Sequence, residues 1–211
     1  EVSFSYGISD RQNINAAPEL TGKKAHLADG TEDLVYTINA ADLLQGYTDV
    51  DGDTLSVQGL ATSHGTLLDN GDGTWSLTPP ANFNDQVELT YSVSDGNGGS
   101  TAATQSFSLA PVNDAPVVSG AVNLGEMDED GTFRITSDQL LANASDVDGD
   151  ALSIVNLQVD NGQGSISENA DGSWTFTPSK DWNGDVSFSY GISDGQNINA
   201  APELTGKKAH L

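Results

Sequence analysis

Two five-residue stretches decide how this chain is organised: Asp49-Val50-Asp51-Gly52-Asp53 and Asp146-Val147-Asp148-Gly149-Asp150. Each places three carboxylates close together with no lysine or arginine nearby. Two like charges about 4 Å apart repel by about 4 kcal/mol at an effective dielectric near 20, so such a loop folds compactly only when a cation neutralises it. Calcium suits the loop, because it takes about six to eight oxygen ligands in a flexible geometry. The two stretches therefore predict calcium-binding loops.

The overall charge favours the same ligand. The chain has 31 Asp and Glu against 7 Lys and Arg, a net charge of −24. Such a chain is a poor partner for nucleic acid or an anionic membrane, and it attracts divalent cations. Cysteine is absent, so in a secreted protein metal ions are expected to take over the bracing role of disulfides. No run of about 18 apolar residues is present, so we expect no direct membrane insertion.

Internal repeats set the domain organisation. Residues 185–211 repeat residues 1–27 with only two substitutions. A shorter period, of 97 residues before a small insertion and 99 after it, relates the two acidic loops and their surroundings. We therefore predict the tail of a preceding repeat, two homologous domains and the start of the next repeat, at residues 1–17, 18–115, 116–201 and 202–211.

Each domain is predicted to consist of β-strands. Val87, Leu89, Tyr91 and Val93 alternate with polar residues, which is typical of a strand with one buried face, and residues 186–192 do the same. Seven strand segments are expected in the first domain, at residues 20–28, 34–38, 54–61, 64–68, 74–78, 87–94 and 101–110. Strands at this spacing predict an all-β fold, a tandem of seven-stranded sandwiches of about 100 residues each.

Local signals refine this prediction. Asp72-Gly73 and Asp171-Gly172 each precede a tryptophan and are typical of hairpin turns. Thr136 and Gln139 have capping-box spacing, which predicts one helical turn before the second acidic loop. The second domain has no counterpart of segment 101–110. Either residues 197–205 serve as its last strand, or a strand comes from elsewhere.

The strand order places the acidic residues at the two ends of each sandwich. If successive strands are antiparallel, the loop 49–53 and Asp95 share the N-terminal end, and Glu32-Asp33 lies at the C-terminal end beside loop 79–85. Stacking the domains end to end then predicts a cage made of Glu32, Asp33, Asn113, Asp114, Asp146, Asp148 and Asp194. The other predicted metal ligands are Asp49, Asp51, Asp53, Asp95, Glu129, Asp130 and Asp150.

The combination of Asn113-Asp114-Ala115-Pro116, Glu129-Asp130-Gly131, the loop 146–150 and Ser193-Asp194-Gly195 resembles the tandem cadherin-like repeats of very large bacterial adhesins of the RTX type. The resemblance covers nearly the whole chain. It implies Ig/cadherin-like sandwiches joined end to end through calcium-binding linkers, with neighbouring repeats of the same chain as partners. It also implies an extracellular, cell-surface location and a non-enzymatic role, extending an adhesin for cell adhesion or biofilm formation. Alanine replaces the linker aspartate at Asn15-Ala16, which predicts a weaker site there.

Other interpretations stay open. The acidic loops can be solvated turns, although they are not EF-hands, because glycine falls at position four rather than six. One domain can itself bind a carbohydrate or a protein, or the chain can be an accessory region of a secreted hydrolase. Residues 1–10 copy the sixth strand of the second domain without the rest of a sandwich. Intermolecular strand exchange is therefore a further hypothesis.

Overall fold

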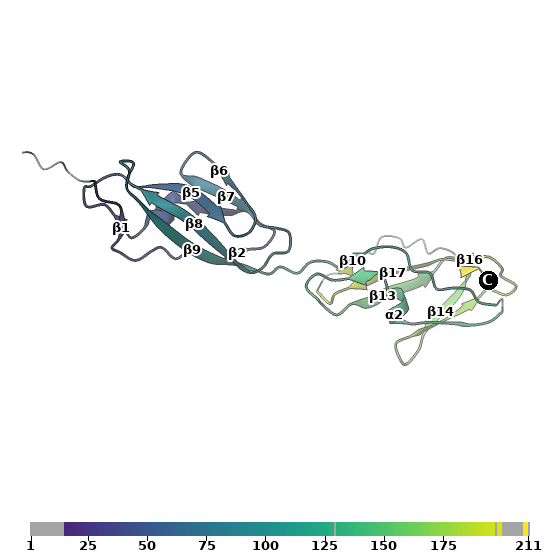
Figure 1. Ribbon diagram of the computed structural model, residues 1–211. Coiled ribbons are helices and arrows are strands. Elements are labelled where there is room, and N and C mark those ends of the chain that lie inside the picture. The colour runs from purple at the N-terminus through teal and green to yellow at the C-terminus, as the bar shows by residue number, and fades with distance from the viewer. Residues whose placement is uncertain (1–14, 129, 197, 200–208, 211) are drawn as a thin grey trace, which may run out of the picture. The chain divides into compact units, whose positions relative to one another are not determined.

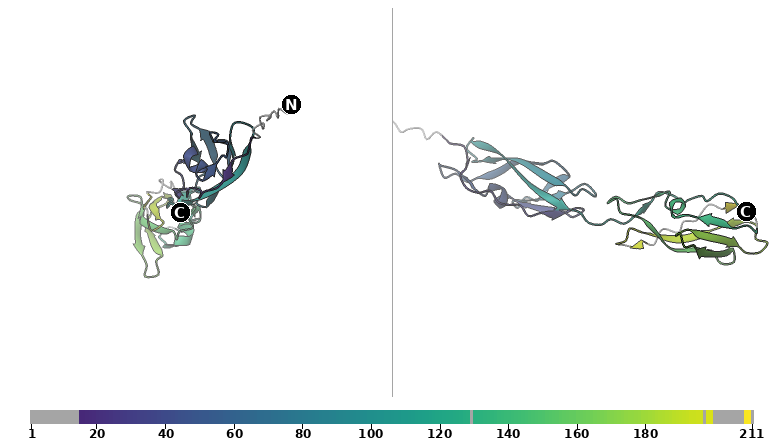
Figure 2. Two further views of the ribbon diagram at one scale, coloured as in Figure 1. Left: turned by 90° about the vertical axis from the view of Figure 1, so that its left-hand side faces the viewer. Right: turned by 90° about the horizontal axis from the view of Figure 1, so that it is seen from below.

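The computed structural model describes residues 15–128, 130–196, 198–199 and 209–210. The chain divides into two compact units, residues 1–112 and 113–211. In each unit the strands lie in two layers around a hydrophobic core (Figure 1, Figure 2). The all-β fold predicted from the sequence is therefore confirmed.

Unit 1 is a sandwich of a four-stranded sheet, in the order β2-β9-β8-β5, and a three-stranded sheet, in the order β3-β7-β6, with a short β1-β4 pair beside them. Its elements are β1 (Glu19–Leu20), β2 (Gly30–Thr31), β3 (Tyr36–Asn39), α1 (Ala40–Leu44), β4 (Tyr47–Thr48), β5 (Ser56–Thr62), β6 (Thr66–Asp69), β7 (Thr74–Thr78), β8 (Gln86–Ser94) and β9 (Ser100–Ala110).

The two longest strands of unit 1 supply much of its core. β8 and β9 are antiparallel and pair from Gln86 with Ser108 to Ser94 with Ser100. The predicted alternation in β8 is present, and β9 buries Ala103, Gln105, Phe107 and Leu109 at the same period of two. Successive side chains of a strand point to opposite faces, so this pattern turns one face of both strands to the core.

The first predicted strand, 20–28, is wrong over most of its length. Only Glu19–Leu20 forms a strand there, and it pairs with β4. Farther on, Gln105 Nε2 donates to the carbonyl of Ala25 at 2.9 Å. A side chain of β9 thus takes the place of a backbone ladder bond, and the segment follows the sheet without joining it.

Unit 2 has the same plan with shorter sheets, in the orders β11-β15-β14 and β13-β17-β18, and with the pairs β10-β12 and β16-β19. Its elements are β10 (Val117–Val118), β11 (Phe133–Ile135), α2 (Ser137–Leu140), β12 (Ala144–Ser145), β13 (Ser153–Val159), β14 (Gly164–Glu168), β15 (Trp174–Pro178), β16 (Asp185–Val186), β17 (Phe188–Ser193), β18 (Ile198–Asn199) and β19 (Ala209–His210).

The last strand of unit 2 comes from two separate pieces of the chain. β18 pairs with β17, and β19 pairs with β16, both antiparallel. Residues 209–210, which the repeat pattern assigns to the start of the next repeat, thus pair inside unit 2. Pairing satisfies backbone groups that β16 and β17 would otherwise leave open. The strand-exchange hypothesis rests on residues 1–10, which lie outside the described residues.

The predicted turns are confirmed. Helix α2 has the full capping box, because Gln139 N donates to Thr136 Oγ1 and Thr136 N donates to Gln139 Oε1. The β14-β15 hairpin turns at Asp171, whose Oδ1 accepts hydrogen bonds from the hydroxyl and amide of Ser173 at 2.6 and 3.1 Å. Arg134 adds a third bond at 2.7 Å. Together they lower the pKa of Asp171 to about 2.

Candidate metal centre

In unit 1 the acidic loop follows helix α1 and strand β4. Oδ1 of Asp49 accepts hydrogen bonds from the amides of Asp51 and Asp53, at 2.8 and 3.4 Å. Gly52 has a φ of 82°, in the left-handed region that glycine adopts without strain. The loop therefore curls around its first carboxylate, and one oxygen each of Asp49, Asp51 and Asp53 lies within 4.8 Å of the others.

Unit 2 repeats this turn. Oδ1 of Asp146 accepts hydrogen bonds from the amides of Asp148 and Asp150, at 3.0 and 3.2 Å. Gly149 has a φ of 78°. The same five residues therefore adopt the same turn in both units.

The linker that leads into each unit is hydrogen-bonded to the acidic loop of that unit. The amide of Ala16 donates to Asp51 Oδ2 at 2.8 Å, and the amide of Asp114 donates to Asp148 Oδ2 at 2.7 Å. These bonds use the backbone, so they form whether the linker residue is Ala or Asp. The two linkers therefore differ at this position only in the side chain, which is a methyl group in Ala16 and a carboxylate in Asp114.

The asparagine before each of these positions binds a second acidic residue. Asn15 Nδ2 donates to Asp95 Oδ2, and Asn113 Nδ2 donates to Asp194 Oδ2, both at 2.8 Å. The linker, the acidic loop and the aspartate after the sixth strand therefore meet at one end of each unit. This is the grouping that alternating strand direction predicts for the N-terminal end.

Asp95 holds this end of unit 1 together. It is 4% exposed and also accepts hydrogen bonds from the amides of Asn97 and Gly99, at 2.8 and 3.0 Å. Burial acts to raise the pKa of Asp95, but the hydrogen bonds from Asn15 and these amides outweigh it and lower the pKa. A Cβ atom at Gly99 would meet the Asp95 carboxylate and lie 2.8 Å from the Cα of Ala17. Gly99 thus permits the close approach of the linker.

Two buried tyrosines anchor the turn that precedes each loop. The hydroxyl of Tyr91 donates to the carbonyl of Leu43 at 2.8 Å, and that of Tyr190 to the carbonyl of Leu140 at 2.9 Å. Burial, with a contribution from Tyr47, raises the pKa of Tyr91 to about 12. Both tyrosines lie on the predicted buried face of a strand, and no role beyond the core was predicted for them. The signal that identifies their role is a hydroxyl on the buried face of a strand, where it must find an acceptor.

The first aspartate of each loop has one oxygen that finds no hydrogen-bond partner among the described residues. These oxygens are Oδ2 of Asp49 and Oδ2 of Asp146, and both are buried. Oδ1 of Asn113 is likewise buried without a hydrogen-bond partner among the described residues. A buried charged oxygen without a donor is costly unless a cation pairs with it. Calcium takes carboxylate and amide oxygens as ligands. The residues at the N-terminal end of each unit therefore fit a calcium ion.

Glu32 occupies the opposite end of unit 1. It is 1% exposed, and its Oε1 accepts a hydrogen bond from the amide of Val112 at 2.6 Å, where the chain leaves the last strand. Its Oε2 is buried and without a hydrogen-bond partner in the part of the chain that the structure describes. A second buried carboxylate oxygen thus lies where the linker begins.

Asp33 and its counterpart Asp130 have the same backbone contact. The amide of Asn82 donates to Asp33 Oδ1 at 3.0 Å, and the amide of Asp181 donates to Asp130 Oδ1 at 3.4 Å. The residues at 33 and 130 both have left-handed backbones, with φ of 60° and 59°. This places Asp33 beside loop 79–85, as predicted. Glu129 lies outside the described residues.

Taken unit by unit, the structure groups most of the predicted ligands. At the N-terminal ends it brings together Asp49, Asp51, Asp53 and Asp95 in unit 1, and Asn113, Asp114, Asp146, Asp148, Asp150 and Asp194 in unit 2. Glu32 and Asp33 lie at the C-terminal end of unit 1. Metal ligation by these residues stays a prediction.

A family model of the cadherin-like domain matches the chain twice, over residues 14–110 and 112–205. The chain belongs to the cadherin-like domain family. Cadherin-like domains are typically extracellular and non-enzymatic, and they commonly bind calcium. No curated protein matches the chain. Among the described residues of both cadherin-like domains, no helix has the length and apolar character needed to cross a membrane.

Several solved structures resemble the tandem of cadherin-like domains at a distance. They include an endo-fucoidan hydrolase of glycoside hydrolase family 107 (21% identity, TM-score 0.35), the human desmocollin-1 ectodomain (17%, 0.34) and the Bacteroides ovatus glucan-utilization protein SGBP-B (16%, 0.30). The matches cover 94%, 93% and 92% of this chain but only 29%, 40% and 48% of those chains. Likenesses of this degree carry no argument about function.

Proposed function

We propose that this pair of cadherin-like domains is a calcium-stiffened spacer of a large secreted bacterial adhesin of the RTX type, which serves cell adhesion or biofilm formation. One observation carries the proposal. In both units the first aspartate of the acidic loop, Asp49 or Asp146, has a buried oxygen without a hydrogen-bond partner among the described residues, in a loop already bonded to the incoming linker. A cation is the partner that such an oxygen needs.

The residues of the chain divide the work as follows. The three aspartates of each loop bind the ion, and the linker asparagine and the aspartate after the sixth strand hold the linker in place beside it. At the middle linker the side chain of Asp114 adds a carboxylate that Ala16 cannot supply. Glu32 and Asp33 extend the proposed site toward the preceding domain, as the strand order predicts.

Consecutive residues of the middle linker are held by different units, which supports a stiff joint. The amide of Val112 is bonded to Glu32 in unit 1, and the side chain of Asn113 is bonded to Asp194 in unit 2. Calcium supplies charge neutralisation when it binds, so that acidic groups that repel one another can stay together. Without it, the same charges favour separation of the loop and the linker.

Calorimetry and distance measurement together test the proposal. The chain has no cysteine, so single cysteines introduced at Thr90 and Ser189 can carry spin labels without background labelling. These are equivalent exposed positions on β8 and β17. Calcium is expected to bind, to raise the melting temperature and to narrow the distribution of label distances, and EDTA is expected to reverse all three. Distances and melting unchanged by EDTA would overturn the proposal.

A glycan-array screen distinguishes the spacer from a carbohydrate-binding domain. The spacer is expected to bind no glycan with or without calcium. Calcium-independent glycan binding by the intact chain would favour the alternative function, a carbohydrate-binding domain of the adhesin. If calcium binds but the distribution of label distances does not narrow, the proposed metal sites are supported and the proposed stiffening role is rejected.

A further inference from the structure

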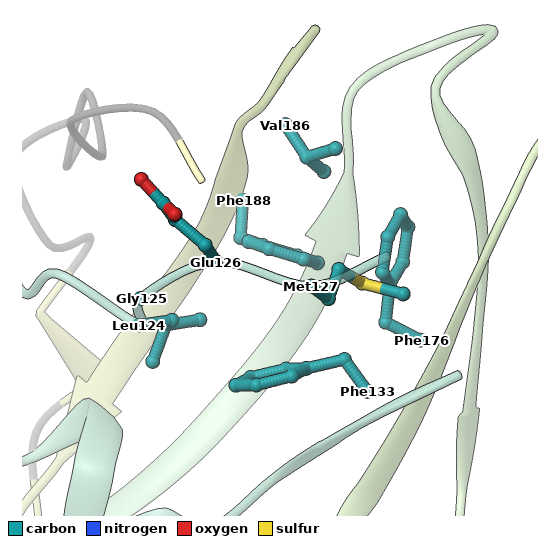
Figure 3. Close-up of a pocket in the computed structure, with 8 residues that line it drawn as sticks. All are labelled: Leu124, Gly125, Glu126, Met127, Phe133, Phe176, Val186 and Phe188. Carbon is teal, nitrogen blue, oxygen red and sulfur yellow. The ribbon is translucent and has the colours of Figure 1, made fainter. Parts of the chain in front are cut away.

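An apolar pocket in unit 2 contains the single methionine of the chain. Figure 3 shows the thioether of Met127 lying against the ring of Phe176, while the carboxylate of Glu126 points away from the aromatic side chains. The free space is about 10 Å³, which holds no more than about one water molecule. The lining residues are Leu124, Gly125, Glu126, Met127, Phe133, Phe176, Val186 and Phe188.

The corresponding place in unit 1 is filled by its last strand, β9. The ring of Phe107 stacks on Tyr36 with 4.0 Å between ring centroids. Leu109 lies so close to Gly30 that a Cβ atom added there would be 2.9 Å from its Cδ2 atom. Gly30 therefore leaves room for a side chain of β9.

Among the described residues of unit 2, no large side chain pairs at the place of Phe107. Val87 pairs with Phe107 in unit 1, whereas its equivalent Val186 pairs with Ala209 in unit 2. Larger side chains take up the volume instead. At three pocket positions where unit 1 has Gly30, Leu77 and Leu89, unit 2 has Met127, Phe176 and Phe188.

Met127 is the chemically vulnerable member of this substitute core. Phe176 and Phe188 fix each other edge to face, with 5.2 Å between ring centroids. Met127 is half-buried and comes from the irregular segment before β11. A thioether fills irregular gaps well, and it is also readily oxidised where an oxidant can reach it. The only sulfur atom in the chain therefore belongs to a side chain that packs against the core of unit 2.

We propose that Met127 is an oxidation site for peroxide, and that its conversion to the sulfoxide loosens unit 2 while leaving unit 1 intact. A lone pair of Sδ attacks one oxygen of hydrogen peroxide, and the S–O bond forms as the O–O bond breaks. The departing oxygen takes up the proton of the transferred oxygen and leaves as water. Thioether is oxidised and peroxide is reduced, so no other reactant is needed.

The sulfoxide oxygen has no suitable place in the pocket. It is a strong hydrogen-bond acceptor, and the groups around Met127 in the pocket interior are apolar side chains. A polar oxygen buried without a donor is unfavourable, so the segment around Met127 must move outward and leave Phe133 and Phe176 less covered. Unit 1 has Gly30 at the equivalent position and is not affected. This inference is independent of calcium binding.

Hydrogen exchange read by mass spectrometry tests the proposal on the intact chain with calcium present. After mild peroxide treatment, the peptide that contains Met127 is expected to gain one oxygen atom. Amides of β11 and β15 are expected to exchange at least about tenfold faster, while those of β3 and β7 in unit 1 stay unchanged. The melting temperature of unit 2 is expected to fall by about 4–8 °C. Methionine sulfoxide reductase should restore both.

Two variants separate oxidation of this site from general damage. Met127→Leu keeps an apolar side chain and is expected to make unit 2 insensitive to peroxide. Met127→Gln places a polar group in the pocket and is expected to reproduce the faster exchange without peroxide. The proposal is overturned if native Met127 resists peroxide that oxidises it in the unfolded chain. It is also overturned if the amides of the oxidised chain exchange at the same rate as those of the untreated chain. The same holds if peroxide speeds amide exchange in Met127→Leu as much as in the native chain.

Discussion

Replacing Asp49 with asparagine is expected to have opposite effects on unit 1 without and with calcium. Asparagine keeps a side-chain oxygen that can accept the hydrogen bonds from the amides of Asp51 and Asp53, so the turn is retained. The substitution removes one negative charge from the loop. It also replaces the buried oxygen that is best placed to bind the ion.

The spacing of the charges gives the size of the first effect. Oxygens of Asp49, Asp51 and Asp53 lie within 4.8 Å of one another. At that distance each like-charge pair repels by about 1 kcal/mol at the dielectric of water. Asp49 belongs to two such pairs, and its buried oxygen lies in a medium less polar than water, so without calcium the variant is expected to be more stable by at least about 2 kcal/mol. Calcium at a hundredfold excess over Kd stabilises the wild type by about 2.7 kcal/mol, and the variant is expected to lose most of this.

Thermal unfolding in EDTA and in saturating calcium measures both effects. Glu88→Gln is the matched control, because it removes the same charge from an exposed position on β8. Asp49→Asn is expected to melt above the wild type in EDTA and below it in calcium, and the control is expected to follow the wild type. A variant that melts below the wild type in EDTA would refute the repulsion argument. An unchanged response to calcium would exclude Asp49 as a ligand.

Three further results are expected. Asp114→Ala should weaken calcium binding several-fold, and Ala16→Asp should strengthen calcium binding at the first linker, both measured by calorimetry, because affinity follows the number of anionic ligands. An unchanged affinity in both variants would exclude the linker carboxylate as a calcium ligand. Tyr190→Phe should lower the free energy of unfolding of unit 2 by about 1–2 kcal/mol in denaturant titration, since a buried carbonyl loses its donor; a loss below about 0.5 kcal/mol would contradict this. Asp171 has a pKa of about 2, below the value near 3.9 of an unfolded chain, so its stabilising contribution is complete above about pH 4 and is lost as the pH falls toward 2. Arg134→Thr, which introduces the residue that unit 1 has at the equivalent position, should raise the titration midpoint of Asp171 measured by NMR. An unchanged midpoint would show that the arginine does not lower this pKa.

The strands and hairpins could be predicted because their signals are local. Alternation in residues 87–93 reports the period of two that any half-buried strand must have. Asp-Gly turns and the Thr136–Gln139 capping box involve groups only a few residues apart. The grouping of Asp95 with the acidic loop also followed from the sequence, because antiparallel strands return to the same end at every second connection.

Contacts made by single side chains across the sandwich could not be predicted in the same way. The segment after β1 is held by Gln105, and nothing in its own sequence signals that a side chain replaces the ladder. The requirement for glycine at position 99 could not be predicted either, because it arises from the close approach of the Asp95 carboxylate and the linker. The buried hydroxyls of Tyr91 and Tyr190 indicate that each needs an acceptor, but only the structure shows that the acceptors are the carbonyls of Leu43 and Leu140.

By itself, the sequence determined the strand pattern, the acidic turns and the end of each sandwich at which they lie, because periodicity, turn chemistry and strand parity are properties of neighbouring residues. Only the tertiary structure decided which described oxygens are buried without a donor, as Oδ2 of Asp49 and Oδ2 of Asp146 are. It also decided that Met127 fills volume that Phe107 and Leu109 fill in unit 1. Packing depends on which distant residues meet, and that is set by the fold as a whole.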